Sequence, residues 1–294
     1  MDQGGCGSCY AFAANQVFAD RTNHALGRTS NPIVFSPQAM ISCNEGYVGN
    51  DGIRFPYGCD GGQAIDMFEW IKEKGAKTCR AEAGTNTHIK DQADDGCAVG
   101  CAPYKSGFVA DGELCDPPRG HETCWGQHPT CDSMSSCGLT FPQDTYEPHC
   151  LQRNSEGYVP VNLIKTHLRE EGPVSVVISS SNPTFQKYWN EKFIYTAQDW
   201  MPYEGSRSDH AVVIVGWGTN PIEYWIVKNS WTASFGDEGF FYVETGKNVL
   251  NIETDVCMIP PAGQIGTRRL SPSEKKFSYY NRSFDKISTS PTGQ

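Results

Sequence analysis

Two cysteines near the start of the chain stand in a setting that could activate a thiol. Cys6 and Cys9 lie within Gln3-Gly4-Gly5-Cys6-Gly7-Ser8-Cys9-Tyr10, and an alanine-rich apolar segment follows. Glycine lets backbone approach a ligand closely, and Ser8 can cap a helix that begins at Cys9. A thiol in the first turn of a helix has a lowered pKa and becomes a nucleophile near neutral pH. A Cys-x-x-Cys pair is more often a disulfide, a metal clip or a redox pair, so the nucleophile interpretation requires partners elsewhere.

A histidine and an asparagine far downstream are suitable partners. His210 opens an apolar run that ends in Gly216-Trp217-Gly218, and Asn229 lies in Lys228-Asn229-Ser230-Trp231. An imidazole beside a thiol stabilises the thiolate as an ion pair and later protonates the leaving amine. A neutral amide fixes the orientation of the ring without adding charge. These residue types, in this order, could form one catalytic group.

The three blocks together resemble the papain family of cysteine peptidases, for which Cys-Gly-[Ser/Ala]-Cys-[Trp/Tyr] is a local signature. The resemblance implies that Cys9 is the nucleophile, His210 its base and acid, and Asn229 the group that orients the imidazole. It also implies that Gln3 donates to the oxyanion, where losing one donor costs on the order of 3 kcal/mol in barrier. Trp231 matches the tryptophan that shields the Asn–His hydrogen bond and borders the substrate site. No cofactor and no metal are implied.

Two further segments resemble substrate-binding parts of this family. The double glycine Gly61-Gly62, after Cys59-Asp60, resembles the cleft segment whose backbone binds an extended peptide; the alternative is a plain turn before a helix. Residues 251–255 resemble the part of cathepsin B whose last acid lies at the base of the S2 pocket. Asp255 would there accept arginine at P2 by charge pairing, alongside apolar residues. The alternative is a surface acid at a strand end.

The cysteine content indicates an oxidising compartment. The chain has 13 cysteines, and a free Cys9 would leave enough for six disulfides. The family resemblance suggests the pairs Cys6–Cys59 and Cys43–Cys79 and leaves the others open. A zinc module is less favoured, because the cysteines are not grouped in two Cys-x-x-Cys pairs. We expect a lysosomal, vacuolar or extracellular protein.

Composition and charge exclude some classes of binding partner. The chain has 294 residues, 38% of them hydrophobic, which suits one large core or two medium ones. A net charge of −10 argues against nucleic acid as a partner, and no apolar run approaches the roughly 20 residues that span a membrane. The resemblance implies peptide or protein substrates, and a propeptide or cystatin-like proteins as inhibitors. Because family members are zymogens with a signal peptide before the nucleophile, we expect that a chain starting at Met1 here is truncated.

The elements that must position these residues begin with a mainly helical left domain, residues 1–96. Helices are predicted from Cys9 to about His24, from Gln38 to Ser42 and from Ala64 to Ile71, with glycines at the ends of the first and third. On the first helix we expect the aromatic residues to pack, and Asp20 and Arg21 to be exposed.

Residues 97–150 differ in character and account for an unusual spacing. They hold seven cysteines and many prolines and glycines, which is typical of a disulfide-stapled loop. His210 lies 201 residues after Cys9, whereas roughly 130–150 are usual in this family, so an insertion is expected here. The segment resembles the occluding loop of cathepsin B. The adjacent histidines that give that enzyme its dipeptide-releasing activity are missing, and His121 and His128 are separated, so an exopeptidase mode is not favoured.

Residues 151–261 are predicted to form a right, β-barrel-like domain. A helix from Val161 to Glu171 leads into the β-branched strand 174–178, and alternating strands carry the histidine and the asparagine. Residues 262–294 have the composition of a flexible tail, with a glycosylation sequon at Asn281. The predicted fold class is α+β, a papain-like two-domain fold with the active-site cleft between the domains.

Two main functions fit these observations. The first is an active cysteine-type endopeptidase of the cathepsin B group, acting through a thiolate–imidazolium pair and a thioester acyl-enzyme. The second is a catalytically impaired homologue that acts as a binding or structural protein. The complete set of candidate residues favours the first, whereas the start of the chain and Tyr10, where the family usually has tryptophan, favour the second. A third possibility, a cysteine-rich extracellular binding module, predicts a disulfide-bonded Cys9.

Overall fold

The computed structural model describes residues 2–27, 32–44, 47–48, 54–55, 58–76, 147–190, 192–200, 207–260 and 288–289. The predictions made for Cys79, His121, His128, Asn281 and most of segments 97–150 and 262–294 lie outside these residues. The boundaries of the predicted domains therefore stay predictions.

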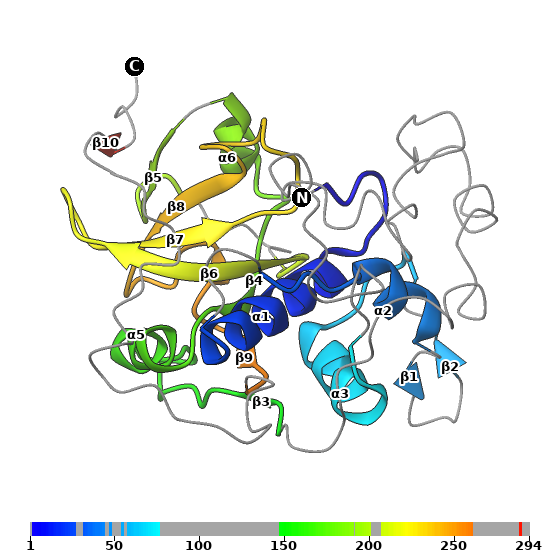
Figure 1. The fold of residues 1–294 in the computed structure, drawn as a ribbon. Coiled ribbons are helices and arrows are strands. Elements are labelled where there is room, and N and C mark those ends of the chain that lie inside the picture. The colour runs from blue at the N-terminus through cyan, green and yellow to red at the C-terminus, as the bar shows by residue number, and fades with distance from the viewer. Residues whose placement is uncertain are drawn as a thin grey trace.

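Three helices make up most of the described N-terminal part (Figure 1). They are α1 (Cys9–Ala25), α2 (Pro37–Cys43) and α3 (Ala64–Lys74), which confirms the three predicted helices. The backbone turns into the left-handed region at Gly27, φ 65°, and Gly75, φ 75°, where a glycine is the favoured residue after a helix. The side chain of Ser36 accepts the N–H of Ala39 and so caps α2. Two short strands, β1 (Tyr47–Val48) and β2 (Arg54–Phe55), pair antiparallel.

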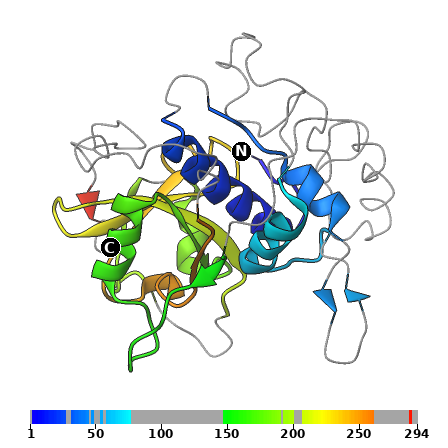
Figure 2. The same cartoon turned by 60° about the horizontal axis from the view of Figure 1, so that its bottom comes forward.

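Two expectations for α1 are wrong. Ser8 occupies the N-cap position, but its side chain makes no capping hydrogen bond; its carbonyl accepts the N–H groups of Ala11 and Phe12 instead. Arg21 is fully buried rather than exposed, and Asp20 is partly buried. Helix α1 is covered on nearly all sides, because it packs against the sheet as well as against α2 and α3 (Figures 1 and 2).

The C-terminal part is built on one eight-stranded sheet, in the order β10-β5-β8-β7-β6-β4-β9-β3. Its strands are β3 (His149–Cys150), β4 (Val174–Ile178), β5 (Phe193–Tyr195), β6 (His210–Gly218), β7 (Tyr224–Lys228), β8 (Phe240–Glu244), β9 (Val256–Met258) and β10 (Ser288–Thr289). The helical elements among them are α5 (Val161–Glu170), α6 (Pro183–Gln186), η4 (Lys187–Asn190) and η5 (Val249–Asn251). The predicted helix and strand at 161–178 are confirmed. None of the helices in the described ranges is long and apolar enough to cross a membrane.

Both faces of the sheet are buried, which explains its nearly continuous apolar strands. Ala211, Val213 and Val215 of β6 face α1 and join the core of the helical part. Val212 and Ile214 point to the opposite face, into a second core with α5 and many aromatic side chains. The alternation of side chains across each strand therefore supplies both cores from the same segments.

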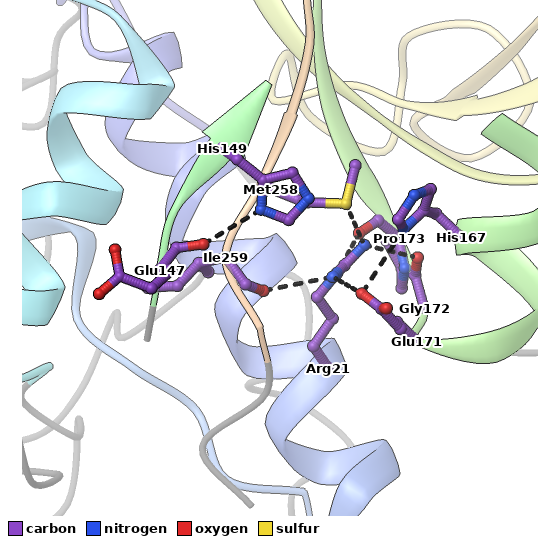
Figure 3. Close-up of polar contacts among 9 residues, drawn as sticks. All are labelled: Arg21, Glu147, His149, His167, Glu171, Gly172, Pro173, Met258 and Ile259. Atoms are coloured by element: carbon purple, nitrogen blue, oxygen red, sulfur yellow. Dashed lines mark hydrogen bonds and ion pairs between the residues drawn. The ribbon is translucent and has the colours of Figure 1, made fainter. Parts of the chain in front are cut away.

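A buried arginine joins α1 to the edge of the sheet (Figure 3). The guanidinium of Arg21 donates to the carbonyl of Pro173 at 2.7 Å, to that of Ile259 at 3.3 Å and to the carboxylate of Glu171 at 2.9 Å. Such a charge is stable inside a protein only when it is paired and hydrogen-bonded. We call Arg21 with these partners the Arg21 hub.

Two disulfides are formed among the described residues. Cys6 pairs with Cys59, as the resemblance suggested, and Cys150 pairs with Cys257, a pairing that the resemblance left open. The second bond links β3 to β9. Cys43 is also disulfide-bonded, but the predicted partner, Cys79, is not among the described residues.

Candidate active site

Cys9 is the first residue of α1 and lies three residues after Cys6 of the Cys6–Cys59 disulfide. It is the free cysteine of the described part of the chain. Its side chain is largely buried, with 9% exposed. The free thiol contradicts the binding-module interpretation, which requires Cys9 in a disulfide.

The glycine between the two cysteines is required by close packing. The N–H of Gly7 donates to the carbonyl of Cys59 at 3.0 Å, and a Cβ on Gly7 would lie 2.5 Å from that oxygen. The same Cβ would lie 3.2 Å from the backbone nitrogen of Gly61. The double glycine therefore lies next to the segment that carries Cys6 and Cys9, with Gly61 close to Gly7 and Gly62 exposed.

Tyr10 helps to hold this loop. Its ring is fully buried, and its hydroxyl donates to the carbonyl of Gly58 at 2.8 Å. A tyrosine at this position therefore has a hydrogen-bond partner of its own, and it does not disturb the packing around Cys9.

His210 and Asn229 are brought together by neighbouring strands. His210 begins β6, and Asn229 follows the end of β7, which pairs antiparallel with β6. The imidazole Nε2 and the amide Oδ1 are 2.7 Å apart. The ring of Trp231 stacks on the imidazole, with centroids 4.5 Å apart and planes 21° from parallel. Trp231 therefore covers the histidine, which is only 4% exposed.

Burial and pairing act in opposite directions on the thiol and the imidazole. Burial tends to raise the pKa of the Cys9 thiol, but the hydrogen bond and charge of His210 outweigh it, and the pKa is lowered. Burial tends to lower the pKa of His210, but the hydrogen bond and charge of Cys9, with help from Asn229, raise it. Each shift favours the charged form, so the geometry stabilises a thiolate–imidazolium pair.

Gln3 is buried beside this pair, and its amide is oriented by two contacts. Its Nε2 donates to the carbonyl of Cys6 at 2.9 Å, and its Oε1 accepts the hydroxyl of Ser230 at 2.5 Å. Its backbone N–H also donates to the carbonyl of Ser230 at 2.9 Å. Ser230 was not singled out from the sequence; its place between Asn229 and Trp231 was the available signal.

Asp209, which directly precedes the histidine, is a second residue that sequence reasoning missed. Its carboxylate accepts the N–H of Ser180 at 2.7 Å and that of Ser181 at 3.1 Å. Burial tends to raise the pKa of Asp209, but the hydrogen bonds from the two serines lower it. The resulting negative charge contributes to the raised pKa of His210.

Asp255 directly precedes β9, which pairs with β4 on the side away from β6 and His210. Val256, the first residue of β9, is paired with Val176 of β4. The Asp255 carboxylate is half-exposed and forms an ion pair with the guanidinium of Arg153. Arg153 also donates from Nε to the carbonyl of Thr254 at 2.8 Å. The predicted acceptor of a basic side chain therefore already has a cationic partner.

Comparisons with known proteins agree with this geometry. The model of the papain family of cysteine proteases matches residues 1–259 of this chain. Cathepsin B-like cysteine proteinase 5 of Caenorhabditis elegans is 29% identical over 260 residues, which are 86% of this chain and 66% of the relative. Cathepsin B-like CP2 of Giardia intestinalis is 28% identical and is covered to the same extents. The chain thus spans slightly less than two thirds of the length of these relatives.

Solved structures show the same fold. Digestive procathepsin L 3 from the larval midgut of Tenebrio molitor superposes with a TM-score of 0.57 at 22% identity, over 88% of this chain and 65% of the other. Bromelain from Ananas comosus gives a TM-score of 0.53 at 22% identity, over 88% of this chain and 92% of bromelain. The predicted papain-like α+β fold is confirmed.

Proposed function

Because the chain belongs to the papain family of cysteine proteases, we propose that it is an active cysteine endopeptidase with Cys9 as its nucleophile. The observation that carries this proposal is the contact between the free thiol of Cys9 at the start of α1 and the imidazole of His210 at the start of β6, which lowers the pKa of the thiol and raises that of the imidazole. Both charged forms are favoured although both groups are buried, and ionisable pairs perturbed in this way cluster at functional sites.

In the proposed reaction, the Cys9 thiolate attacks the carbonyl carbon of the scissile peptide and forms a C–S bond. The oxyanion is stabilised by the Gln3 side-chain amide and the Cys9 backbone N–H. The imidazolium of His210 gives its proton to the leaving amine as the C–N bond breaks. The neutral imidazole then takes a proton from a water molecule, and the resulting hydroxide attacks the thioester carbonyl. The C–S bond breaks, the carboxylic acid product leaves, and the thiolate–imidazolium pair is restored. Asn229 keeps the ring oriented throughout, and Trp231 keeps water from their hydrogen bond.

We assign the enzyme to the cathepsin B group, and several observations support this. Cathepsin B-like proteinases are among the relatives, and the segment ending at Asp255 matches that group's S2 region. The backbone of Gly61 and Gly62 would bind the extended substrate. The disulfides, together with a relative described as a gut-specific cysteine proteinase, support a protein of the secretory route that acts in a lysosome, a vacuole or outside the cell.

A catalytically impaired homologue is the second candidate. The Tyr10 substitution no longer supports it, because the tyrosine packs with its hydroxyl hydrogen-bonded. The free thiol and its contact with His210 also oppose it. This candidate predicts that Cys9 reacts no faster than an ordinary thiol.

Site-mapped alkylation separates the two candidates. The folded, non-reduced protein is treated at about pH 6 with limiting iodoacetamide, where an ordinary thiol is almost entirely protonated, and the adduct is located by mass spectrometry. We expect fast, single modification at Cys9, and a loss of most of that rate in His210→Ala, where the hydrogen bond and charge of the imidazole no longer lower the pKa of the thiol. Labelling at the rate of a model thiol would leave only the impaired homologue.

A further inference from the structure

One face of α1 meets the sheet at two levels. Gln16 and Asp20 follow Cys9 by seven and eleven residues, close to two and three helical turns, so the three side chains share a face of the helix. Cys9 meets His210 at the first level. At the second level, roughly 10 to 17 Å from Cys9 along the helix axis, this face carries the polar side chains of Gln16 and Asp20.

These polar groups are joined to the strand that leads to Asn229. Lys228, the last residue of β7, donates from Nζ to Oε1 of Gln16 at 2.8 Å. Gln16 is buried, and Oδ2 of Asp20 is buried as well. Burial raises the pKa of the Asp20 carboxyl, while the charge of Lys228 and a hydrogen bond with Gln16 work against that increase. A helix of the N-terminal part and a strand of the sheet are therefore connected through a largely buried, charged contact.

The contact is continuous with the candidate active site. A cavity of about 10 Å³ is lined by Gln16, Lys228 and Asn229, together with apolar residues of α1 and β6. Lys228 precedes Asn229 directly, so the position of the lysine backbone determines where the asparagine side chain begins. The nucleophile is on α1 and the Asn229–His210 pair is on the sheet, so a shift between α1 and β7 would change the distance from thiol to imidazole.

We propose that Gln16, Asp20 and Lys228 form a positioning clamp that sets the alignment of Cys9 with His210. This inference rests on the proposed peptidase function. The clamp residues do not touch the reacting atoms. They act by tying α1 to β7 two turns from the nucleophile, and a misplacement near 1 Å can reduce a rate by about 100-fold.

The Arg21 hub provides a matched control (Figure 3). It anchors the same helix to the same sheet, but through β9 and the residues before β4 rather than through β7. Loss of Arg21 removes a fully buried charge, and loss of Lys228 removes a partly buried one, each with its hydrogen bonds, so both losses should destabilise the protein. Only loss of the clamp should change the alignment at Cys9.

The experiment compares Lys228→Met with Arg21→Met, with Lys228→Arg as the conservative rescue. The readouts are the thermal midpoint, the pH dependence of Cys9 alkylation, and kcat and KM on one peptide substrate. We expect Lys228→Met to raise the apparent pKa of the Cys9 thiolate and to lower kcat by about 10- to 100-fold, with KM nearly unchanged. Lys228→Arg should recover most of kcat, and Arg21→Met should lower the midpoint without moving the alkylation profile.

A double variant keeps the proposal testable if Lys228→Met alone does not fold. Asp20→Asn/Lys228→Met removes both charges together, so no unpaired carboxylate remains buried, and it should show the same altered profile. If the folded Lys228→Met and double variants kept the wild-type pH profile of Cys9 alkylation and the wild-type kcat, the proposed clamp would be overturned. An equal change in the pH dependence of Cys9 alkylation in Arg21→Met would also overturn the proposed clamp, because any loss of contacts between α1 and the sheet would then be enough to misalign Cys9. An unreactive Cys9 in the wild-type protein would overturn the proposed function and the clamp together, and it would be seen before any variant is made.

Discussion

At the scale of residues, the site depends on two buried groups, Cys9 and His210, each of which favours the charged form of the other. Burial alone would leave Cys9 as a thiol and His210 as a neutral imidazole. Their contact reverses both tendencies, and Asp209 adds a negative charge that favours the imidazolium. The proposed activity should therefore span the pH range between the lowered pKa of the thiol and the raised pKa of the imidazole.

If the segment at Asp255 borders the S2 pocket as proposed, Arg153 should affect the preference of the enzyme for a basic side chain at P2. Its ion pair with Asp255 is half-exposed, so it contributes at most about 1 kcal/mol, or a factor of about five. We predict that Arg153→Ala raises kcat/KM for arginine at P2 by up to about fivefold, because Asp255 becomes available, while kcat/KM for phenylalanine at P2 stays unchanged. Matched substrates that differ only at P2 provide the measurement.

Two further variants test the origin of this effect. Asp255→Ala should lower the arginine-to-phenylalanine ratio, and Arg153→Ala should have no effect on the ratio once Asp255 is gone. An unchanged ratio in Arg153→Ala would show that the basic side chain does not reach Asp255, and that the ion pair is only a surface contact.

At the scale of elements, the glycine between the cysteines links the nucleophile helix to the loop before α3. A Cβ at Gly7 would lie 2.5 Å from the carbonyl oxygen of Cys59, and the neighbouring disulfide prevents the loop from moving away freely. We predict that Gly7→Ala destabilises the fold by about 1–3 kcal/mol and slows Cys9 alkylation, because the backbone before α1 must move. Urea unfolding and alkylation at about pH 6 measure the two effects.

Gly216 in β6 is a suitable control for this prediction. A Cβ there would meet only Cδ1 of Ile226, at 3.7 Å, which is ordinary van der Waals contact. Gly216→Ala should therefore keep the alkylation rate of the wild-type protein. If Gly7→Ala also kept it, the close approach of the loop would not be what places Cys9.

Local patterns were sufficient to predict the elements that carry the candidate site. Helix α1 was predictable because an apolar run begins at Cys9 and a glycine follows it, and β4 because its β-branched residues follow Gly172-Pro173. The contacts that hold these elements together were not predictable. Arg21 was expected to be exposed, since its acceptors lie about 150 residues or more away in the sequence. Gln16 and Lys228 are separated by 212 residues, and no local pattern reports such a pairing.

At the scale of the whole molecule, α1 is the central element, since it belongs to the helical part and also covers one face of the sheet (Figure 2). Among the described residues, the helical part and the sheet are joined by apolar packing of α1 against β6 and by polar contacts that include the proposed clamp, the Arg21 hub and the hydrogen bonds between Gln3 and Ser230. Because Cys9 and His210 lie on opposite sides of this junction, the stability of the junction and the integrity of the site should be lost together on unfolding.

Acid should weaken this junction through Glu171. The pKa of this carboxyl is lowered from its usual 4.5 to about 2, first by the contact with His167 and then, against burial, by Arg21. A lowered pKa in the folded state means that the stabilisation is complete above about 4.5 and is lost as the pH falls toward 2. We predict that the free energy of unfolding falls less between about pH 5 and pH 3 in Glu171→Gln than in the wild-type protein.

Urea unfolding of the iodoacetamide-blocked protein at several pH values measures this difference without self-digestion. Glu170→Gln is the matched control, because Glu170 is the preceding residue on the exposed side of α5. Its unfolding free energy should follow the wild-type dependence on pH. If the unfolding free energy of Glu171→Gln also followed the wild-type dependence on pH, protonation of Glu171 would not weaken its contact with Arg21. Any loss of stability in acid would then have to originate in other carboxylates.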